Sequence, residues 1–158
     1  MEIKFEFVKR IKEQLNVTTV DKKGFSLPIK GSKNAAGYDF INPEDVTIQP
    51  GEIKYVKTGI KSKFPEDMAL LLLNRSSNPK KKGLILANGI GLIDADYYNN
   101  EDNEGEIAFA FMNITDEPIL IKCGDKLGQG MFIKYFDITN LDTSNISTRT
   151  GGFGSTGK

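Results

Sequence analysis

The sequence predicts an all-β protein, because hydrophobic residues recur with a period of two, turn signals are closely spaced and helix signals are weak. Over residues 3–7, Ile3, Phe5 and Phe7 alternate with charged residues, which indicates a half-buried strand. Turn signals recur about every 8–12 residues, a spacing typical of a β-sandwich, a barrel or a jelly roll. The chain has 158 residues, and we expect one core domain over residues 1–137.

The next strands are predicted from the same pattern. Val46 and Ile48 alternate with polar residues before a turn at residues 49–52. A second strand is expected over residues 53–58, directly after this turn. Residues 68–73 form a continuous apolar run, which indicates a buried strand.

Three further strands are expected towards the C-terminus. In residues 107–111, bulky apolar residues alternate with alanines, and the small alanines indicate that both faces of the strand are covered. Two short strands follow, over residues 119–122 and 131–136, separated by the turn signal Gly124 and Asp125.

Helix signals are restricted to two segments. Apolar residues at spacings of three and four over residues 8–15 fit a helix, and a strand that continues into a loop fits equally well. A short helical turn is expected at residues 78–82, because Pro79 is tolerated in the first turn of a helix.

The residue counts exclude several classes of function. Lys plus Arg and Asp plus Glu are both 21, so the chain lacks the basic surplus that favours a nucleic-acid partner. The absence of histidine excludes a Ser-His-Asp triad and an HExxH zinc site. The single cysteine, Cys123, excludes an internal disulfide and fits a reducing compartment. No apolar run exceeds six residues and no signal segment is visible, so we expect a soluble, cytoplasmic protein without a membrane partner.

Asp94 and Asp96 form the first candidate site, after the closely spaced Gly89 and Gly91. Such glycines suit a hairpin or a bulge where the backbone approaches a ligand. In an extended segment the two carboxylates lie on the same side and repel each other unless a positive charge lies between them. The pair therefore indicates either a functional site or a loop with two solvated aspartates.

A second candidate site is formed by Arg75, Ser76 and Ser77 after the apolar run. A guanidinium binds phosphate oxygens bidentately, so the segment fits an oxyanion site at a strand end, or an ordinary surface turn. Residues 80–82 are three lysines that are either solvated or raise the local potential for an anionic substrate. Without histidine, acid–base chemistry falls to carboxylates, lysines or tyrosines, helped by a hard cation such as Mg2+.

Residues 138–158 differ from the rest of the chain, because they are rich in Thr, Asn, Ser, Asp and Gly. Such a segment buries too little surface to offset its ordering entropy, which predicts a mobile tail. Glycine amides such as that of Gly154, with the hydroxyls of Ser155 and Thr156, can bind phosphate oxygens. Phe153 has no local core to enter and can dock on a nucleobase.

Five segments resemble, in this order along the chain, the five motifs of the trimeric dUTP nucleotidohydrolases (dUTPases). They are residues 36–40, 74–77, 89–97, 124–129 and 149–157. The resemblance begins near residue 25 and extends to the C-terminus, and its third and fifth motifs are the most specific.

This resemblance implies a jelly-roll subunit and a homotrimer with three active sites. Each site would take motifs one, two and four from one chain, motif three from a second and motif five from a third. Residues 138–158 would then be an arm that closes over a neighbouring active site. The implied reaction is attack of water at the α-phosphorus of dUTP, giving dUMP and pyrophosphate, which keeps uracil out of DNA and supplies dUMP for thymidylate synthesis. Mg2+ is implied as cofactor, held by the substrate triphosphate and water with no direct protein ligand.

The resemblance also implies roles for individual residues around the nucleoside and the attacking water. Asp94 would orient and deprotonate the water. Asn88, with the backbone around Leu92 and Ile93, would read uracil in a hairpin too tight for the methyl group of thymine. Tyr97 would pack under the deoxyribose and leave no room for a 2′-hydroxyl.

Further roles are implied around the phosphates, where the expected phosphate-binding residues are Arg75, Ser76, Ser77, Gln129, Arg149, Gly154, Ser155 and Thr156. Phe153 would stack on uracil. Asp39 would support the site, or its metal-bound water, from behind.

Three departures from the family pattern are visible. Ser77 stands where glycine is usual, and the fifth motif is one residue shorter between Arg149 and Phe153. The acidic segment 98–105 is longer than usual, and is expected to be a surface loop or a contact surface for another protein. The alternatives to a dUTPase are a dCTP deaminase or bifunctional relative, and a dUTP-binding regulatory protein without turnover. Asp94 argues against a pure binding protein, which has no need of that carboxylate.

Overall fold

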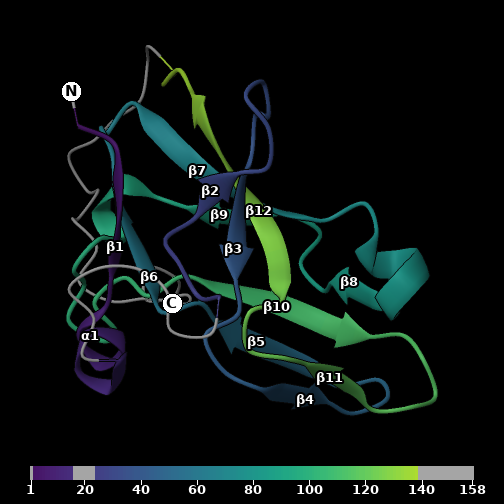
Figure 1. The fold of residues 1–158 in the computed structure, drawn as a ribbon. Helices are drawn as coiled ribbons and strands as arrows, with labels where there is room; N and C mark the ends of the chain where they lie inside the picture. The colour runs from purple at the N-terminus through teal and green to yellow at the C-terminus, as the bar shows by residue number, and fades with distance from the viewer. Residues whose placement is uncertain (1, 16–23, 139–158) are drawn as a thin grey trace.

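The computed structural model describes residues 2–15 and 24–138, and over these residues the all-β prediction is confirmed (Figure 1). The strands are β1 (Lys4–Phe7), β2 (Ile29–Lys30), β3 (Tyr38–Ile41), β4 (Val46–Ile48), β5 (Ile53–Lys57), β6 (Ile60–Lys63), β7 (Met68–Asn74), β8 (Leu84–Leu86), β9 (Gly91–Ile93), β10 (Ala108–Asn113), β11 (Ile119–Ile121) and β12 (Lys126–Lys134). The helical elements are α1 (Lys9–Leu15) and two short turns, η1 (Asn78–Lys82) and η2 (Ala95–Tyr97). Within these described ranges, no helix combines the length and apolar character that crossing a membrane requires.

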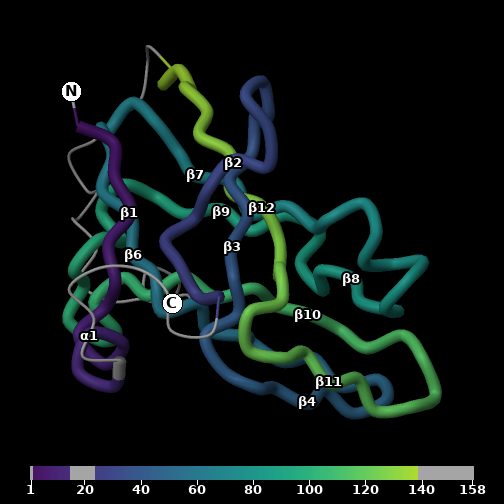
Figure 2. Tube along the Cα trace, viewed as in Figure 1, coloured from purple at the N-terminus to yellow at the C-terminus, as the bar shows by residue number. Residues whose placement is uncertain are grey.

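The largest sheet has five strands in the order β2-β3-β12-β7-β9, and all neighbours are antiparallel. Its central strand, β12, comes from the C-terminal end of the described chain and lies between β3 and β7. Figures 1 and 2 show this sheet above the strands β4, β5, β10 and β11. Segments far apart in the sequence are therefore side by side in the sheet.

The remaining strands form a three-stranded sheet, β5-β10-β8, and the pairs β4-β11 and β1-β6. Side chains of the five-stranded sheet and of the other strands meet in one core. The ring of Phe40 on β3 packs edge to face on the ring of Phe109 on β10, with 5.5 Å between the ring centroids. Phe40, Leu70 and Phe111 are fully buried. Burial of such large apolar side chains is the main contribution to the stability of the sandwich.

At the N-terminus the structure decides between the two alternatives for residues 8–15 in favour of a helix. Val8 and Ile11 are both 2% exposed and point into the core. The Val8 N–H donates to the Gly59 carbonyl at 2.9 Å, and a Cβ on Gly59 would lie 2.5 Å from Ile11. Gly59 also has a positive φ of 71°, so glycine is required both for the turn and for the close approach of α1.

The predicted strands are present, with shifted bounds towards the C-terminus. The last strand begins at Lys126, directly after the Gly124–Asp125 turn, and not at residue 131. Its early part contains two glycines, which obscure the alternating pattern. The expected turn at residues 78–82 is η1, a single π-helical turn. Ala110 of β10 is buried as expected, whereas Ala108 is only half-buried.

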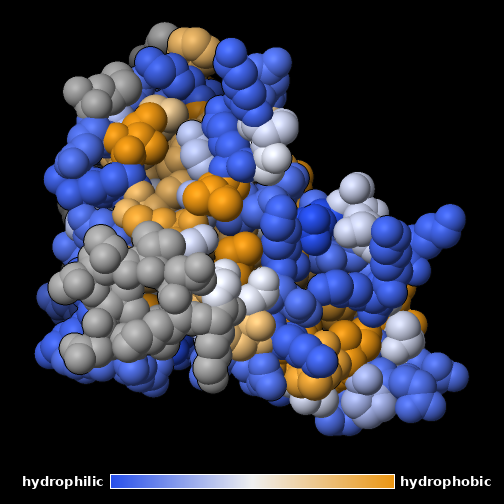
Figure 3. Space-filling model, viewed as in Figure 1, coloured by the Kyte–Doolittle hydropathy of each residue, from blue (hydrophilic) through white to orange (hydrophobic). Residues whose placement is uncertain are grey.

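Apolar side chains are also exposed on the surface of this single chain. Figure 3 shows them gathered in two places on one face, at the left and at the lower right. Large exposed apolar residues include Tyr55 on β5, Leu92 on β9, Leu120 on β11 and Phe136 beyond β12. Exposed apolar patches are typical of surfaces that another molecule covers.

Candidate active site

A buried carboxylate, Asp39, lies at the centre of a polar cluster on the five-stranded sheet. Its side chain is 4% exposed, and Lys126 Nζ lies 2.7 Å from Asp39 Oδ2. Gln129 Nε2 donates to Asp39 Oδ1 at 3.1 Å, and Arg75 Nε lies 3.8 Å from the same oxygen. The cluster therefore joins residues of the first, second and fourth segments that the sequence singled out.

The strand register explains why these residues meet. Gln129 on β12 pairs with Asp39 on β3 on one side and with Leu73 on β7 on the other. Arg75 follows Asn74, the last residue of β7, and so lies close to Gln129 and Asp39. A Cβ on Gly37 would lie 3.2 Å from Gln129 Cβ, so a larger residue there would press on the glutamine.

The charges around Asp39 keep it ionised. Burial by itself would raise the pKa of Asp39, but hydrogen bonds from Lys126 and Gln129 and the charge of Arg75 outweigh burial. The pKa of Asp39 is therefore lowered below its ordinary value. An ionised Asp39 holds both cations beside one another, where their charges can meet an anionic ligand.

The turn that carries Arg75, Ser76 and Ser77 is fastened by two asparagines. Asn74 Oδ1 accepts from the Arg75 N–H at 2.9 Å and from Asn78 Nδ2 at 2.8 Å. Asn78, which is 1% exposed, also donates to the Leu127 carbonyl at 2.8 Å and so ties the turn to β12. Ser76 is exposed, and Ser77 has a φ of −81°, a conformation that does not require the glycine usual in the family.

The third segment begins in the turn between β8 and β9. These two strands do not form the expected hairpin, because β8 pairs with β10 and β9 pairs with β7. Asn88 and Leu92 are exposed, and Ile93 is half-buried at the end of β9. Asp94 is half-buried with extended backbone, φ −84° and ψ 157°, and it begins the turn η2. Asp96 lies inside η2, so the segment is not extended, and the condition under which both carboxylates would lie on one side of a strand is not met.

Tyr97, the last residue of η2, is 5% exposed. Its hydroxyl donates to the Glu106 carbonyl at 3.1 Å and accepts from Asn103 Nδ2 at 2.8 Å. The ring is thus held from the side of the loop 98–105.

Within one chain the structure does not bring Asp94 to the Asp39 cluster. Strand β9 pairs antiparallel with β7, with Gly91 opposite Leu72 and Ile93 opposite Leu70. Asp94 therefore lies level with residue 69, six residues before Arg75, or about 20 Å along the strand. The carboxylate and the basic cluster lie towards opposite ends of the same sheet.

Five of the predicted site residues, Arg149, Phe153, Gly154, Ser155 and Thr156, lie outside the described residues. In the described part, no group of three or more His, Cys, Asp and Glu side chains is arranged to hold a metal ion.

Two residues of this site were not among the predicted ones. Lys126 was signalled only by its position within the segment 124–129. It lies three residues before Gln129, and the register shift between the two residues explains why both side chains reach Asp39. Asn78 carries no sequence signal, because its role depends on the burial of its amide between two segments.

The comparisons with known proteins agree with this geometry. The sequence profile of the dUTPase family matches residues 23–157. A deoxyuridine 5′-triphosphate nucleotidohydrolase of Lactococcus lactis is 43% identical over 141 residues, which cover 89% of this chain and 94% of the relative. The enzyme of the same name from Rickettsia felis is 33% identical over 149 residues, covering 91% and 97%.

Solved structures give the same result. The dUTPase of Streptococcus mutans superposes with a TM-score of 0.76 at 38% identity, covering 86% of this chain and 98% of that one. A mutant dUTPase of phage phi11 of Staphylococcus aureus, which coordinates a structural Mg(II) ion, has the same fold, with a TM-score of 0.68 at 19% identity and coverage of 92% and 99%. The expected jelly-roll subunit is confirmed, and the chain belongs to the dUTPase family.

Proposed function

We propose that this chain hydrolyses dUTP to dUMP and pyrophosphate. The family and the names of the relatives support this activity. One observation in the structure carries it, namely the meeting of Arg75, Lys126 and Gln129 around the buried Asp39. Two cations and an amide donor on the central strands of the sheet, near the end of β7, suit a triphosphate, which needs mainly positioning and charge neutralisation during hydrolysis.

The phosphate-binding surface consists of Arg75, Ser76, Ser77 and Gln129. Arg75 is partly exposed and anchored through Asn74, so its guanidinium can bind phosphate oxygens while Asp39 limits its rotation. Asp39 acts from behind this surface and also holds Gln129. Arg149, Gly154, Ser155 and Thr156 are proposed to complete the phosphate site, with Phe153 stacked on uracil.

Asp94 is proposed as the base. Its carboxylate takes a proton from a water molecule, and the water oxygen forms a bond to the α-phosphorus of dUTP. The bond from the α-phosphorus to the oxygen that bridges to the β-phosphorus breaks, and pyrophosphate leaves with that oxygen. Asn88 and the backbone of Leu92 and Ile93 bind uracil, and Tyr97 lies under the deoxyribose.

The site is proposed to form between chains of a homotrimer. The separation of Asp94 from Arg75 along β7 supports this arrangement, because a single triphosphate cannot contact both ends of the sheet. Exposed apolar residues such as Phe136 and Tyr55 are available for contacts between chains. Residues 138–158 are proposed as the arm that closes over a neighbouring site, and the substrate as the Mg2+ complex of dUTP, in which the triphosphate binds the ion.

Two further proposals concern the location of the protein in the cell and a protein partner. A cytoplasmic location is supported by the free, partly exposed thiol of Cys123. Glu101 and Asp102 are exposed in the loop 98–105, and we propose that this loop is a contact surface for another protein.

The first experiment is product analysis with Mg2+ and, separately, dUTP, dCTP, dTTP and UTP, for the wild type and Asp94→Asn. We expect dUMP and pyrophosphate from dUTP alone, and a rate at least about a hundredfold lower in the variant, the scale of a lost general base. Binding of dUTP by the variant should be largely retained. Ammonia from dCTP would identify a deaminase, and binding without product in the wild type would identify a regulatory protein.

A further inference from the structure

The loop 98–105 has an ordered internal structure around one buried side chain, Asn100, which is 7% exposed. Its Nδ2 donates to the Tyr97 carbonyl at 2.9 Å and to Asn103 Oδ1 at 2.8 Å. Its Oδ1 accepts from the N–H groups of Asp102 and Asn103 at 3.0 and 3.1 Å. All four contacts link the loop to itself or to Tyr97, so the loop and the tyrosine form one unit.

The backbone conformation of this loop also brings it close to Tyr97. Asn99 and Glu104 have positive φ values of 57° and 60°, which are uncommon for residues other than glycine. Gly105 has a φ of 77°, and a Cβ there would lie 2.4 Å from the Tyr97 carbonyl. The loop is therefore folded back tightly against the backbone of Tyr97.

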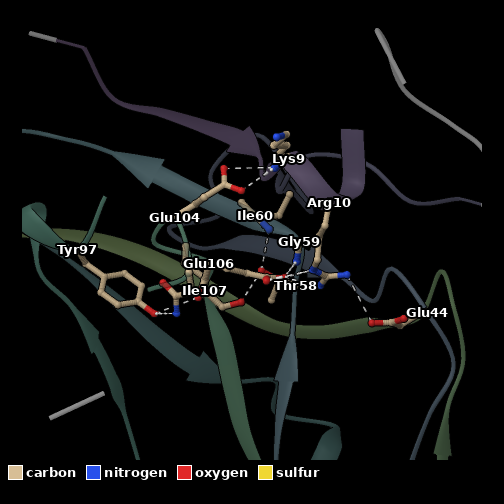
Figure 4. Close-up of polar contacts among 11 residues, drawn as sticks. Lys9, Arg10, Glu44, Thr58, Gly59, Ile60, Tyr97, Glu104, Glu106 and Ile107 are labelled. Atoms are coloured by element: carbon tan, nitrogen blue, oxygen red, sulfur yellow. Dashed lines mark hydrogen bonds and ion pairs between the residues drawn. The ribbon is translucent and has the colours of Figure 1, made fainter. Parts of the chain in front are cut away.

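The hydroxyl of Tyr97 is held directly by this loop and its base. Asn103 Nδ2 donates to Tyr97 Oη at 2.8 Å, and Oη donates to the carbonyl of Glu106 at 3.1 Å (Figure 4). With both partners fixed, the hydroxyl end of the phenol can be displaced sideways only if these hydrogen bonds break.

The base of the loop is fixed in turn by the N-terminal helix. The Glu106 side chain is 6% exposed, accepts from the Gly59 N–H at 2.8 Å and pairs with the guanidinium of Arg10, whose Nε lies 3.1 Å from Oε2 (Figure 4). Glu104 accepts from the N–H of Lys9 at 3.2 Å. The family profile begins at residue 23, so this support comes from a part of the chain that the profile does not cover.

We propose that the loop 98–105 is a positioning device for Tyr97, with Asn103 and Arg10 as positioning residues for the selection of deoxyribose. Asn103 fixes the phenol hydroxyl, and Arg10 fixes Glu106, whose carbonyl receives that hydroxyl. Neither residue touches the substrate. The inference rests on the proposed function, because it assumes that Tyr97 excludes a 2′-hydroxyl.

A cavity beside the hydrogen bonds of Tyr97 Oη affects the choice of variants that test the proposal. Tyr55, Lys57, Asn103, Glu106 and Ala108 line a cavity of about 220 Å³. Water can enter from the cavity and replace the amide in Asn103→Ala. Asn103→Leu fills a similar space without a hydrogen-bond donor, so no water replaces the lost contact to Tyr97 Oη. It also removes the oxygen that accepts from Asn100 Nδ2 and from the Gly105 N–H, so Tyr97→Phe is needed beside it to isolate the contact to Oη.

The test compares kcat/KM for dUTP and for UTP in the wild type, Asn103→Leu and Tyr97→Phe. Tyr97→Phe keeps the ring and removes the hydroxyl, so it breaks the same contact from the other side. We expect the ratio of dUTP to UTP to fall about three- to tenfold in each, the scale of one lost hydrogen bond. In the double variant it should fall by less than the two single losses combined, because the contact between Asn103 and Tyr97 can be lost only once. Glu101→Gln, in the same loop and exposed, is the matched control and should keep the ratio.

Arg10 is tested by the same ratio together with thermal stability. Arg10→Gln leaves Glu106 buried without its cation, so it should lower both the ratio and the melting temperature. Arg10→Lys should restore part of the ratio. Glu44→Gln removes only the exposed partner of Arg10 at 3.7 Å and should leave the ratio unchanged.

Three results would overturn the inference. These are an unchanged ratio in Asn103→Leu and Tyr97→Phe, equal losses with dUTP and UTP in stable variants, or additive effects in the double variant. A wild type that does not hydrolyse dUTP would instead overturn the proposed function.

Discussion

At the scale of single residues, Asp39 holds together the cluster formed with Arg75, Lys126 and Gln129. It is buried beneath two cations and a glutamine, and its lowered pKa keeps it charged at neutral pH. Losing one member of such a buried group leaves the others without compensation, which costs more than an exposed ion pair contributes. The residue therefore supports both the folded state and the orientation of Arg75.

The pH dependence of stability should report this charge. A carboxyl whose pKa is lower in the folded than in the unfolded state stabilises the protein above its unfolded pKa, and the stabilisation is lost as pH falls through the folded value. We expect the difference in unfolding free energy between the wild type and Asp39→Asn to be largest near pH 7 and to shrink below about pH 4. Urea unfolding at pH 7 and pH 3 measures it. A difference that stays constant would contradict the role of the Asp39 charge.

At the scale of elements, β12 is the central strand of the five-stranded sheet, and two of its glycines lie directly against aromatic rings of the core. A Cβ on Gly128 would lie 2.2 Å from the Phe109 ring, and one on Gly130 would lie 2.7 Å from Phe40. These glycines let the aromatic core pack directly against the strand that presents Gln129. The packing and the position of the site are thus set by the same strand.

Gly128→Ala should therefore destabilise the protein by about 1–3 kcal/mol, the usual effect of overpacking a core. The urea midpoint at constant m-value measures this change. Gly31→Ala is the comparison variant, because Gly31 is exposed and a Cβ there would make only an ordinary contact of 3.4 Å, with Asp39 Oδ2. Replacing Phe109 by leucine in the Gly128→Ala background should recover part of the loss. If Gly128→Ala and Gly31→Ala have the same effect, the close contact with Phe109 is not limiting.

At the scale of the whole molecule, the separation of Asp94 from Arg75 has a direct consequence for activity. A site that needs both residues must combine two chains if one chain cannot bring them together. Chains with a defect in only one of the two residues should then complement each other in a mixed assembly.

Complementation is measured by co-expressing Asp94→Asn and Arg75→Ala chains with different affinity tags. Each variant alone should be nearly inactive. With random mixing, about a quarter of the sites combine an intact Asp94 with an intact Arg75 from another chain, so about a quarter of wild-type activity should return. No recovery in purified mixed assemblies would place both residues in one chain's site and contradict the shared arrangement.

The sequence alone was sufficient for the fold class, for most strands and for the family. Alternating residues such as Ile3, Phe5 and Phe7 determine which face of a strand is buried, and this periodicity is local. Motif residues such as Arg75, Asp94 and Gln129 could be named because their order and spacing are preserved along the chain.

Only the tertiary structure decided what depends on contacts between distant segments. The helix of residues 9–15 forms because Val8 and Ile11 find a buried site beside Gly59, and the local pattern fits a strand equally well. Asp96 lies in the turn η2, whereas the sequence left an extended segment and a loop open. The roles of Asn78, Asn103 and Arg10 depend on hydrogen-bond partners up to 96 residues away, and such partners are set by the tertiary structure and not by the local sequence.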